Sequence, residues 1–93
     1  MGQYKVIFSK LAITHLEYHK KSGRKSDVKK IQDIVAELAQ HPETGTGNPE
    51  RLKGNYADFW SRRLNKKDRM VYRIMEDEVV VFVVRAKGHY EDK

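Results

Sequence analysis

The 93-residue sequence predicts a single α+β domain, with two N-terminal helices packed on one face of a small, mainly antiparallel twisted sheet. After a short first strand, apolar residues recur at helical spacing only between residues 10 and 41. Short segments of strand-forming residues, bounded by turn signals, fill the second half of the chain. The length allows one hydrophobic core, and no internal repeat or linker divides it.

The first half predicts a strand and two helices. Apolar and polar residues alternate from Tyr4 to Phe8, which indicates a half-buried strand. Ser9 is a suitable N-cap for a first helix, which ends at basic residues and Gly23. Ser26 opens a second helix, which ends at His41-Pro42. Helical spacing relates Ala12, Ile13, Leu16 and His19 in the first helix, and an apolar stripe along the second consists of Val28, Ile31, Ile34, Val35 and Leu38. The solvent-exposed face of the second helix is expected to carry Lys29, Lys30, Asp33 and Glu37.

The second half predicts a loop followed by a meander. Residues 42–49, PETGTGNP, contain both prolines and lead into Glu50. Strands are expected over Phe59–Leu64, Met70–Met75 and Val79–Arg85, with turns at 65–68 and 76–78. Side chains alternate along a strand, so Met70, Tyr72 and Ile74 should lie under the helices. Arg69 and Arg73 should then point from the opposite side of the sheet, the open face, and alternation with Leu64 favours Arg63 over Arg62 there.

Composition excludes several classes of protein. The absence of cysteine excludes a disulfide scaffold, a thiolate zinc site and a cysteine nucleophile. No segment reads as an export signal, and no apolar run approaches the length of a membrane span. We therefore expect a cytoplasmic protein without a membrane partner.

Positive charge is concentrated in residues 51–75, which hold eight basic and two acidic residues, while the rest of the chain balances to zero. The eight are Arg51, Lys53, Arg62, Arg63, Lys66, Lys67, Arg69 and Arg73. We expect this segment on the open face, where it would bind a polyanion. Composition gives similar weight to a second interpretation, in which basic strand edges only discourage aggregation.

Three motifs resemble ligand sites but lack essential parts. GTGNPE runs from a helix towards a strand, and it lacks the lysine and hydroxyl of a phosphate-binding loop. His15 and His19 lie one helical turn apart in HLEYH, but no third zinc ligand is evident, so ordinary helix-surface histidines are expected. The acidic run at 76–78 fits a solvated turn better than a cation site. We therefore expect neither a metal nor a cofactor.

The remaining candidate residues suit RNA cleavage. They are Glu50, Lys53, Arg63, Arg69, His89 and Tyr90. RNA carries its own nucleophile, the 2′-hydroxyl, so cleavage needs a base, cations for the phosphorane charge and an acid for the leaving oxygen. Glutamate, arginine and histidine can supply these roles without metal, although each residue taken alone has an ordinary structural explanation.

The run GTGNPERLKGNYADFWSRRLNKKDRMVYRI, followed by KGHY, resembles the YoeB/Txe branch of the RelE/ParE toxin superfamily. Its blocks match G-x-G-x-P-E-x-L-K, F-W-S-R-R, H/D-R-x-V-Y and a terminal H-Y. The resemblance implies the RelE-like, microbial-ribonuclease-like fold and a type II toxin that cleaves mRNA on the ribosome without metal. It also implies contact with mRNA and ribosomal RNA and a Phd/YefM-type antitoxin. A homodimer is one possible state, which the sequence alone does not decide.

The resemblance also assigns roles. Glu50 would be the base, Arg69 would stabilise the transition state, His89 would be the acid and Tyr90 would orient the substrate. Lys53 and Arg63 would contact phosphate. From the charge pattern, Lys66 and Lys67 at the exposed turn are also expected to bind nucleic acid. The sequence departs from relatives that end in R-Y-H-Y, because Ala86-Lys87-Gly88 separates Arg85 from His89.

Two other functions remain open. The same fold could block the ribosomal A site without cleaving mRNA, or it could poison DNA gyrase as ParE-like toxins do. The set of Glu50, Arg69, His89 and Tyr90 counts against the gyrase poison. It does not separate the blocker from the nuclease.

Overall fold

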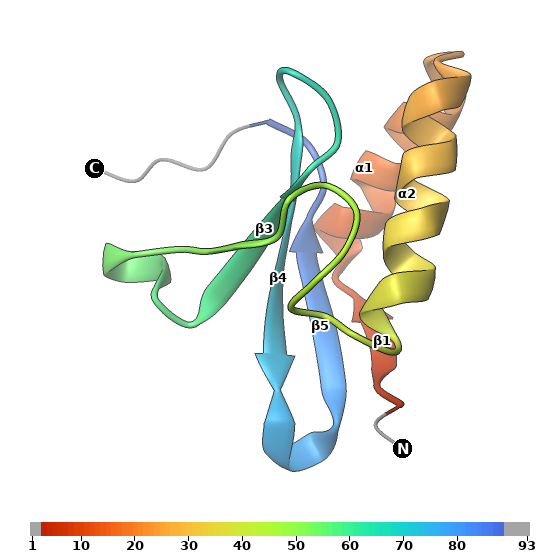
Figure 1. Cartoon of the computed structure of the whole chain (residues 1–93). Coiled ribbons are helices and arrows are strands. Elements are labelled where there is room, and N and C mark those ends of the chain that lie inside the picture. Colours follow the sequence, from red (N-terminus) through yellow and green to blue (C-terminus); the bar gives the residue numbers. More distant parts are fainter. Residues whose placement is uncertain (1–2, 89–93) are drawn as a thin grey trace.

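The computed structural model describes residues 3–88 and confirms the α+β fold class, with two helices on one side of a five-stranded sheet (Figure 1). The helices are α1 (Lys10–Lys21) and α2 (Lys25–Leu38). The strands are β1 (Lys5–Phe8), β2 (Glu50–Arg51), β3 (Phe59–Arg63), β4 (Arg69–Met75) and β5 (Val80–Arg85), and 3₁₀ turns span Gly54–Tyr56 and Glu76–Glu78. In the sheet the strand order is β1-β5-β4-β3-β2. Only the β1–β5 pair is parallel among the strand pairs of these residues.

The core lies between the helices and the sheet, as the alternation in β4 predicted. Met70 and Tyr72 are fully buried, and Ile74 packs against the cluster that they form. The other buried members are Ala12, Ile31, Ile34, Leu38, Leu64, Val81, Val83 and Ala86. Among residues 3–88 no helix is long and apolar enough to cross a membrane.

The first helix begins as expected but differs in its inward face. Ser9 is the N-cap, and its Oγ accepts a hydrogen bond from the Ala12 N–H at 3.0 Å. Ile13, expected to face inward, is 48% exposed. The expectation of surface histidines is wrong for His19, which is 1% exposed and packs beneath the helix.

The second helix begins at Lys25 rather than Ser26, with Arg24 as an N-cap that makes no side-chain capping bond. Its apolar stripe is confirmed, because Ile31, Ile34 and Leu38 are buried. Glu37 was wrongly expected on the solvent-exposed face. Its carboxylate instead turns towards the sheet and accepts hydrogen bonds from two partners described below.

Two features of the sheet lay outside the sequence expectations. The two-residue strand β2 pairs antiparallel with β3, so Glu50 lies within the sheet opposite Ser61. A bulge then breaks the β4–β5 register between Val71 and Tyr72. Tyr72 lies opposite Val83 but Val71 lies opposite Arg85, so the bulge shifts the alternation of β5 and brings Ala86 into the core.

Candidate active site on the open face of the sheet

The open face brings a glutamate and two arginines together from three strands. Arg63 on β3 lies directly opposite Arg69 on β4. Arg69 Nη1 is 3.9 Å from Glu50 Oε1 on β2, and the two side chains are 22% and 57% exposed. Like charges placed directly opposite one another destabilise a sheet unless an anion lies between them. The cross-strand pair of arginines therefore favours a bound anion. In this structure the Glu50 carboxylate is the anionic group beside Arg69.

The prediction that Arg63, and not Arg62, faces the open side of the sheet is confirmed. Arg63 is exposed on the open face, whereas Arg62 is 0% exposed and points towards the helices. The expectation that the whole basic segment lies on the open face is therefore wrong. Arg51 also departs from it, because it lies opposite Trp60, a residue that packs against the core. The positive charge is divided between the two faces of the sheet.

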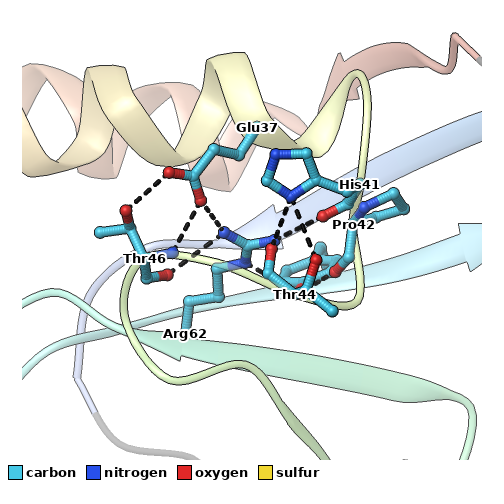
Figure 2. A network of polar contacts seen from close by, with 7 residues as sticks. Glu37, His41, Pro42, Thr44, Thr46 and Arg62 are labelled. Atoms are coloured by element: carbon cyan, nitrogen blue, oxygen red, sulfur yellow. Dashed lines mark hydrogen bonds and ion pairs between the residues drawn. The ribbon is translucent and has the colours of Figure 1, made fainter.

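Arg62 anchors the loop that leads to Glu50 (Figure 2). Its Nη1 donates to Glu37 Oε1 at 2.6 Å, and its Nε donates to the Tyr72 hydroxyl at 3.1 Å. The remaining guanidinium contacts are with loop and helix-end carbonyls, those of His41, Thr44 and Thr46. Because these bonds hold both ends of residues 42–46, the loop reaches β2 in a fixed conformation.

Both carboxylate oxygens of Glu37 also hold the loop. Oε1 accepts the Thr46 N–H at 2.7 Å and Oε2 accepts the Thr46 hydroxyl at 2.6 Å. Burial raises the pKa of Glu37, but the hydrogen bonds from Thr46 and Arg62 outweigh it and hold the pKa below its usual value. Burial raises the pKa of the Tyr72 hydroxyl, which donates to the Pro42 carbonyl at 2.6 Å. At neutral pH Glu37 is therefore ionised and the Tyr72 hydroxyl keeps its proton.

The glycine-rich loop is required by close packing on β3. Gly47 has φ +86° and its carbonyl accepts the Arg63 N–H at 2.7 Å. A Cβ at this position would lie 2.9 Å from the Arg63 carbonyl oxygen. The GTGNPE motif, rejected as a phosphate loop, therefore has a structural role in placing Glu50.

The chain leaves the described residues beside Arg69. The Gly88 carbonyl accepts the Arg69 N–H at 3.1 Å, and the Gly88 N–H donates to Asp68 Oδ1 at 2.9 Å. Burial raises the pKa of Asp68, but the bonds from Gly88 and Asn65 outweigh it and keep the carboxylate ionised. The expected acid His89 and the expected orienting residue Tyr90 lie outside the described residues.

The remaining candidates lie around this pair of strands. Lys53 is exposed at the start of the 3₁₀ turn that follows β2. Lys66 and Lys67 are exposed in the turn between β3 and β4, which Asn65 organises by accepting the Lys67 and Asp68 N–H groups at 2.8 Å. The structure thus brings Glu50, Arg63 and Arg69 together, and the three lysines lie in the segments that follow β2 and β3.

Two polar residues near the pair were missed from the sequence. One sheet row contains Glu50, Ser61, Val71 and Arg85. Ser61 Oγ and Arg85 Nε are buried and have no hydrogen-bond partner among residues 3–88. Unsatisfied buried polar atoms are rare in native structures, and each calls for a specific explanation, such as a functional role. Ser61 lies within the F-W-S-R-R motif, which was the signal that could have found it. The position of Arg85 on the open face depends on the bulge, which the sequence does not reveal.

Metal-ligating residues are not gathered in the part of the chain that the structure describes. Within residues 3–88, no three histidine, aspartate or glutamate side chains lie close enough to share an ion. The positively charged residues of the open face are instead suited to an anionic ligand.

Comparisons with known proteins agree with this arrangement. A model of the YoeB-like toxin of bacterial type II toxin-antitoxin systems matches residues 8–90. Toxin YoeB of Synechocystis is 33% identical over 86 residues, which cover 88% of this chain and 98% of that protein. The YoeB/ParE toxin from Agrobacterium tumefaciens has a TM-score of 0.83 at 30% identity, covering 92% of this chain and 99% of that one.

Three further solved structures show two relatives in other states. YoeB from Staphylococcus aureus, 29% identical, was solved as a dimer and in a heterotetrameric complex with YefM, with TM-scores of 0.79 and 0.77 and coverage of 95% of this chain and 99% of that one. A metal-bound toxin from Helicobacter pylori is 28% identical, with a TM-score of 0.78 and coverage of 92% and 94%. Because the family model spans most of the sequence, including the loop, strands β2 to β5 and the candidate site, this chain belongs to the YoeB-like toxins of bacterial type II toxin-antitoxin systems.

Proposed function

We propose that this toxin is an endoribonuclease that cleaves mRNA on the ribosome by internal transesterification. The observation that carries the proposal is the loose pair of Glu50 and Arg69 on the open face, with Arg63 directly opposite Arg69. A carboxylate beside two accessible guanidinium groups offers a proton acceptor next to a phosphate-binding position. Membership of the toxin family supports the same assignment.

The reaction uses the RNA's own nucleophile. Glu50 accepts the proton of a ribose 2′-hydroxyl, and the 2′-oxygen forms a bond to the neighbouring phosphorus. Arg69 donates hydrogen bonds to the phosphorane oxygens as negative charge develops there. The bond from phosphorus to the 5′-oxygen breaks, and His89 transfers its proton to that oxygen. The products are a 2′,3′-cyclic phosphate and a 5′-hydroxyl end.

Other residues hold the substrate. Arg63 and Lys53 bind phosphates on either side of the scissile bond, and Tyr90 orients the nucleotide. Lys66 and Lys67 contact RNA at the edge of the site, where they are exposed to solvent. The ribosome supplies the positioning that so small a surface lacks.

The proposed reaction needs no metal ion, since arginine side chains neutralise the phosphorane. A related toxin from Helicobacter pylori is metal-bound, so the question calls for a direct test. Ribosomes held at the magnesium concentration they require should support cleavage equally with and without added zinc or manganese. Strict dependence on either added ion would replace the metal-free mechanism by a metal-assisted one.

The proposed partners are a YefM-type antitoxin and a second copy of the toxin. The Staphylococcus aureus relative assembles with YefM in a heterotetramer and also forms a dimer. The exposed arginines and lysines of the open face would attract an acidic antitoxin segment. Binding of antitoxin and of ribosomes should then be mutually exclusive.

Mapping mRNA ends on stalled ribosomes tests the proposal. Purified wild-type toxin should yield 2′,3′-cyclic phosphate ends within the A-site codon, and His89→Gln should yield none. Arg73→Ala is a matched control, because Arg73 lies on the same strand and face but opposite Phe59. Intact mRNA on stalled ribosomes would instead identify a non-cleaving blocker, and intact mRNA with trapped gyrase–DNA complexes would identify a gyrase poison.

A further inference from the structure

Two histidines of α1 bind the backbone of the same residue, Ala86. The Ala86 N–H donates to His15 Nδ1 at 3.0 Å. The Ala86 carbonyl lies 2.7 Å from His19 Nε2. Ala86 and His19 are buried, and 71 residues separate His15 from Ala86 in the sequence. The end of β5 is therefore held from both sides by one helical turn of α1.

The chemistry of the partners fixes the protonation of both rings. A carbonyl oxygen only accepts, so His19 Nε2 must carry a proton. A backbone N–H only donates, so His15 Nδ1 must be unprotonated. His15 is therefore a neutral imidazole with its proton on Nε2, and protonation of Nδ1 would place two donors against each other.

The clamped residue begins the segment that leads to the candidate acid. Gly88 is held by Asp68 Oδ1 and by the Arg69 N–H, two residues beyond Ala86. Residues 86–88 are thus fixed by α1 at one end and by the start of β4 at the other. His89 is the next residue in the sequence.

We propose that His15 and His19 are positioning residues, which hold the end of β5 so that His89 follows from a fixed point beside Arg69. Their effect on cleavage rests on the proposed function, whereas their effect on the backbone does not. The clamp needs His15 to be neutral, so it opens when the ring is protonated.

The surroundings of His15 set the pH at which this happens. Arg85 and Lys87 face the ring from the end of β5, Lys67 and Asp68 from the β3–β4 turn, and Tyr18 and His19 from α1. Burial lowers the pKa of His15, the charges of Arg85, Lys87 and His19 lower it further, and Asp68 opposes them weakly. The ring lines an open groove of about 520 Å³, so solvent protons reach it.

Acidification should weaken the contribution of His15 to stability. The folded-state pKa lies below the unfolded value of 6.5. The stabilising contribution of neutral His15 is therefore complete above about pH 6.5 and is lost as the pH falls through the folded-state value. At neutral pH the clamp is closed.

Amide hydrogen exchange at Ala86 and Gly88 tests the clamp without requiring cleavage. His15→Leu keeps bulk but removes the acceptor, and exchange should accelerate about five- to ten-fold, the equivalent of one hydrogen bond. His15→Asn places a side-chain oxygen near the Nδ1 position and should exchange like wild type. Acidification below pH 6.5 should lower the protection factor of the Ala86 amide, which is the intrinsic exchange rate divided by the observed rate, in wild type but not in His15→Asn. Glu17→Leu, on the exposed side of α1, is the control for the leucine.

Single-turnover cleavage on programmed ribosomes then tests positioning. His15→Leu should lower the cleavage rate about five- to ten-fold with unchanged ribosome affinity, and His15→Asn should restore it. His19→Gln, which keeps a donor near Nε2, should outperform His19→Leu in the same way. Unchanged exchange in His15→Leu would overturn the clamp, and faster exchange with a wild-type cleavage rate would overturn its positioning role.

Two further comparisons separate the absence of the clamp from a variant that fails to fold and from a toxin that fails to cleave. If His15→Leu does not fold, the pH comparison between wild type and His15→Asn decides, and an equal loss of protection at Ala86 in both proteins would overturn the clamp. If wild type fails to cleave mRNA, the proposed function fails while the exchange results still decide whether the clamp exists.

Discussion

Two arginine–glutamate pairs lie on opposite faces of the same sheet and differ in the distance between their charged atoms and in their exposure to solvent. Arg62 Nη1 and Glu37 Oε1 are 2.6 Å apart, with side chains 0% and 23% exposed. Arg69 Nη1 and Glu50 Oε1 are 3.9 Å apart, with side chains 22% and 57% exposed. Arg62 of the first pair is fully buried, whereas both side chains of the second pair are partly exposed to solvent.

The difference shows which arginine can act on a substrate. Arg62 donates five hydrogen bonds to protein acceptors, as many as a guanidinium has N–H groups. No donor is left for a phosphate. Arg69 makes a longer, exposed ion pair that contributes little to stability, so a phosphate can replace Glu50 at small cost. The two arginines thus differ in whether a donor remains free to bind a ligand.

The largest expected effect is the loss of the buried pair. Arg62→Leu would leave Glu37 and several carbonyls without their donor, and we expect the free energy of unfolding to fall by about 3–5 kcal/mol. Arg63→Leu, the adjacent residue on the open face, should change it by less than about 0.5 kcal/mol. Urea denaturation in a His89→Gln background, which should permit expression, measures both. Equal stability of the two variants would contradict the distinction.

The second effect concerns the open pair. Arg69→Ala should lower single-turnover cleavage by roughly 10²- to 10³-fold, because it removes a donor to the transition state. Its unfolding free energy should stay within about 0.5 kcal/mol of wild type, since the ion pair is exposed. Arg73→Ala should retain activity. Unchanged toxicity of Arg69→Ala at equal expression would show that the site has been misassigned.

The third effect extends the comparison to the β3–β4 turn. Ribosome affinity of the wild-type toxin should fall about ten-fold or more between 50 and 200 mM salt, because several phosphates are neutralised. Replacing Lys66 and Lys67 together by alanine should flatten this slope by about one unit for each phosphate that the variant no longer neutralises. Co-sedimentation with ribosomes across the salt range measures it. Identical slopes would mean that these lysines only maintain solubility.

The smallest effect is a pH dependence of the buried pair. The pKa of Glu37 lies below its usual 4.5 in the folded state, so its contribution to stability is complete above about pH 4.5 and is lost as the pH falls through the folded-state value. Glu37→Gln should be less stable than wild type at pH 6, and the gap should narrow towards pH 3. Asp68 titrates in both proteins, so its effect cancels in the difference between their stabilities. A constant gap, measured by urea midpoints, would exclude ionised Glu37 as the relevant partner.

Sequence patterns correctly predicted the features that are set by residues close together in the chain. Alternation placed Met70 and Tyr72 in the core and distinguished Arg63 from Arg62. The Ser9 cap is also a local signal and is confirmed. Glu50 and Arg69 were chosen from chemistry and motif, and the structure brings them together, although their roles stay predictions.

Misassignments arose where the partner is distant in the sequence. Glu37 was placed on the solvent-exposed face because its acceptor role depends on Arg62, 25 residues later. His19 was taken for a surface residue because its partner is the Ala86 carbonyl, 67 residues away. Strand β2 has two residues, too few for any alternation, and the bulge in the β4–β5 pair shifts a register that sequence alone treats as continuous.

The parallel pairing of β1 with β5 bears on how the toxin is synthesised. Lys5–Phe8 pairs with β5 alone among the described strands, through a register that runs from Val80 to Val83. During translation β1 therefore has no sheet partner until nearly the whole domain has been made, and closing so long a loop slows folding. The sheet, and with it the open face, is completed only after these late residues have left the ribosome that made them. Under the ribosome-dependent function proposed above, we expect a nascent toxin to be inactive towards the ribosome that is still synthesising β5.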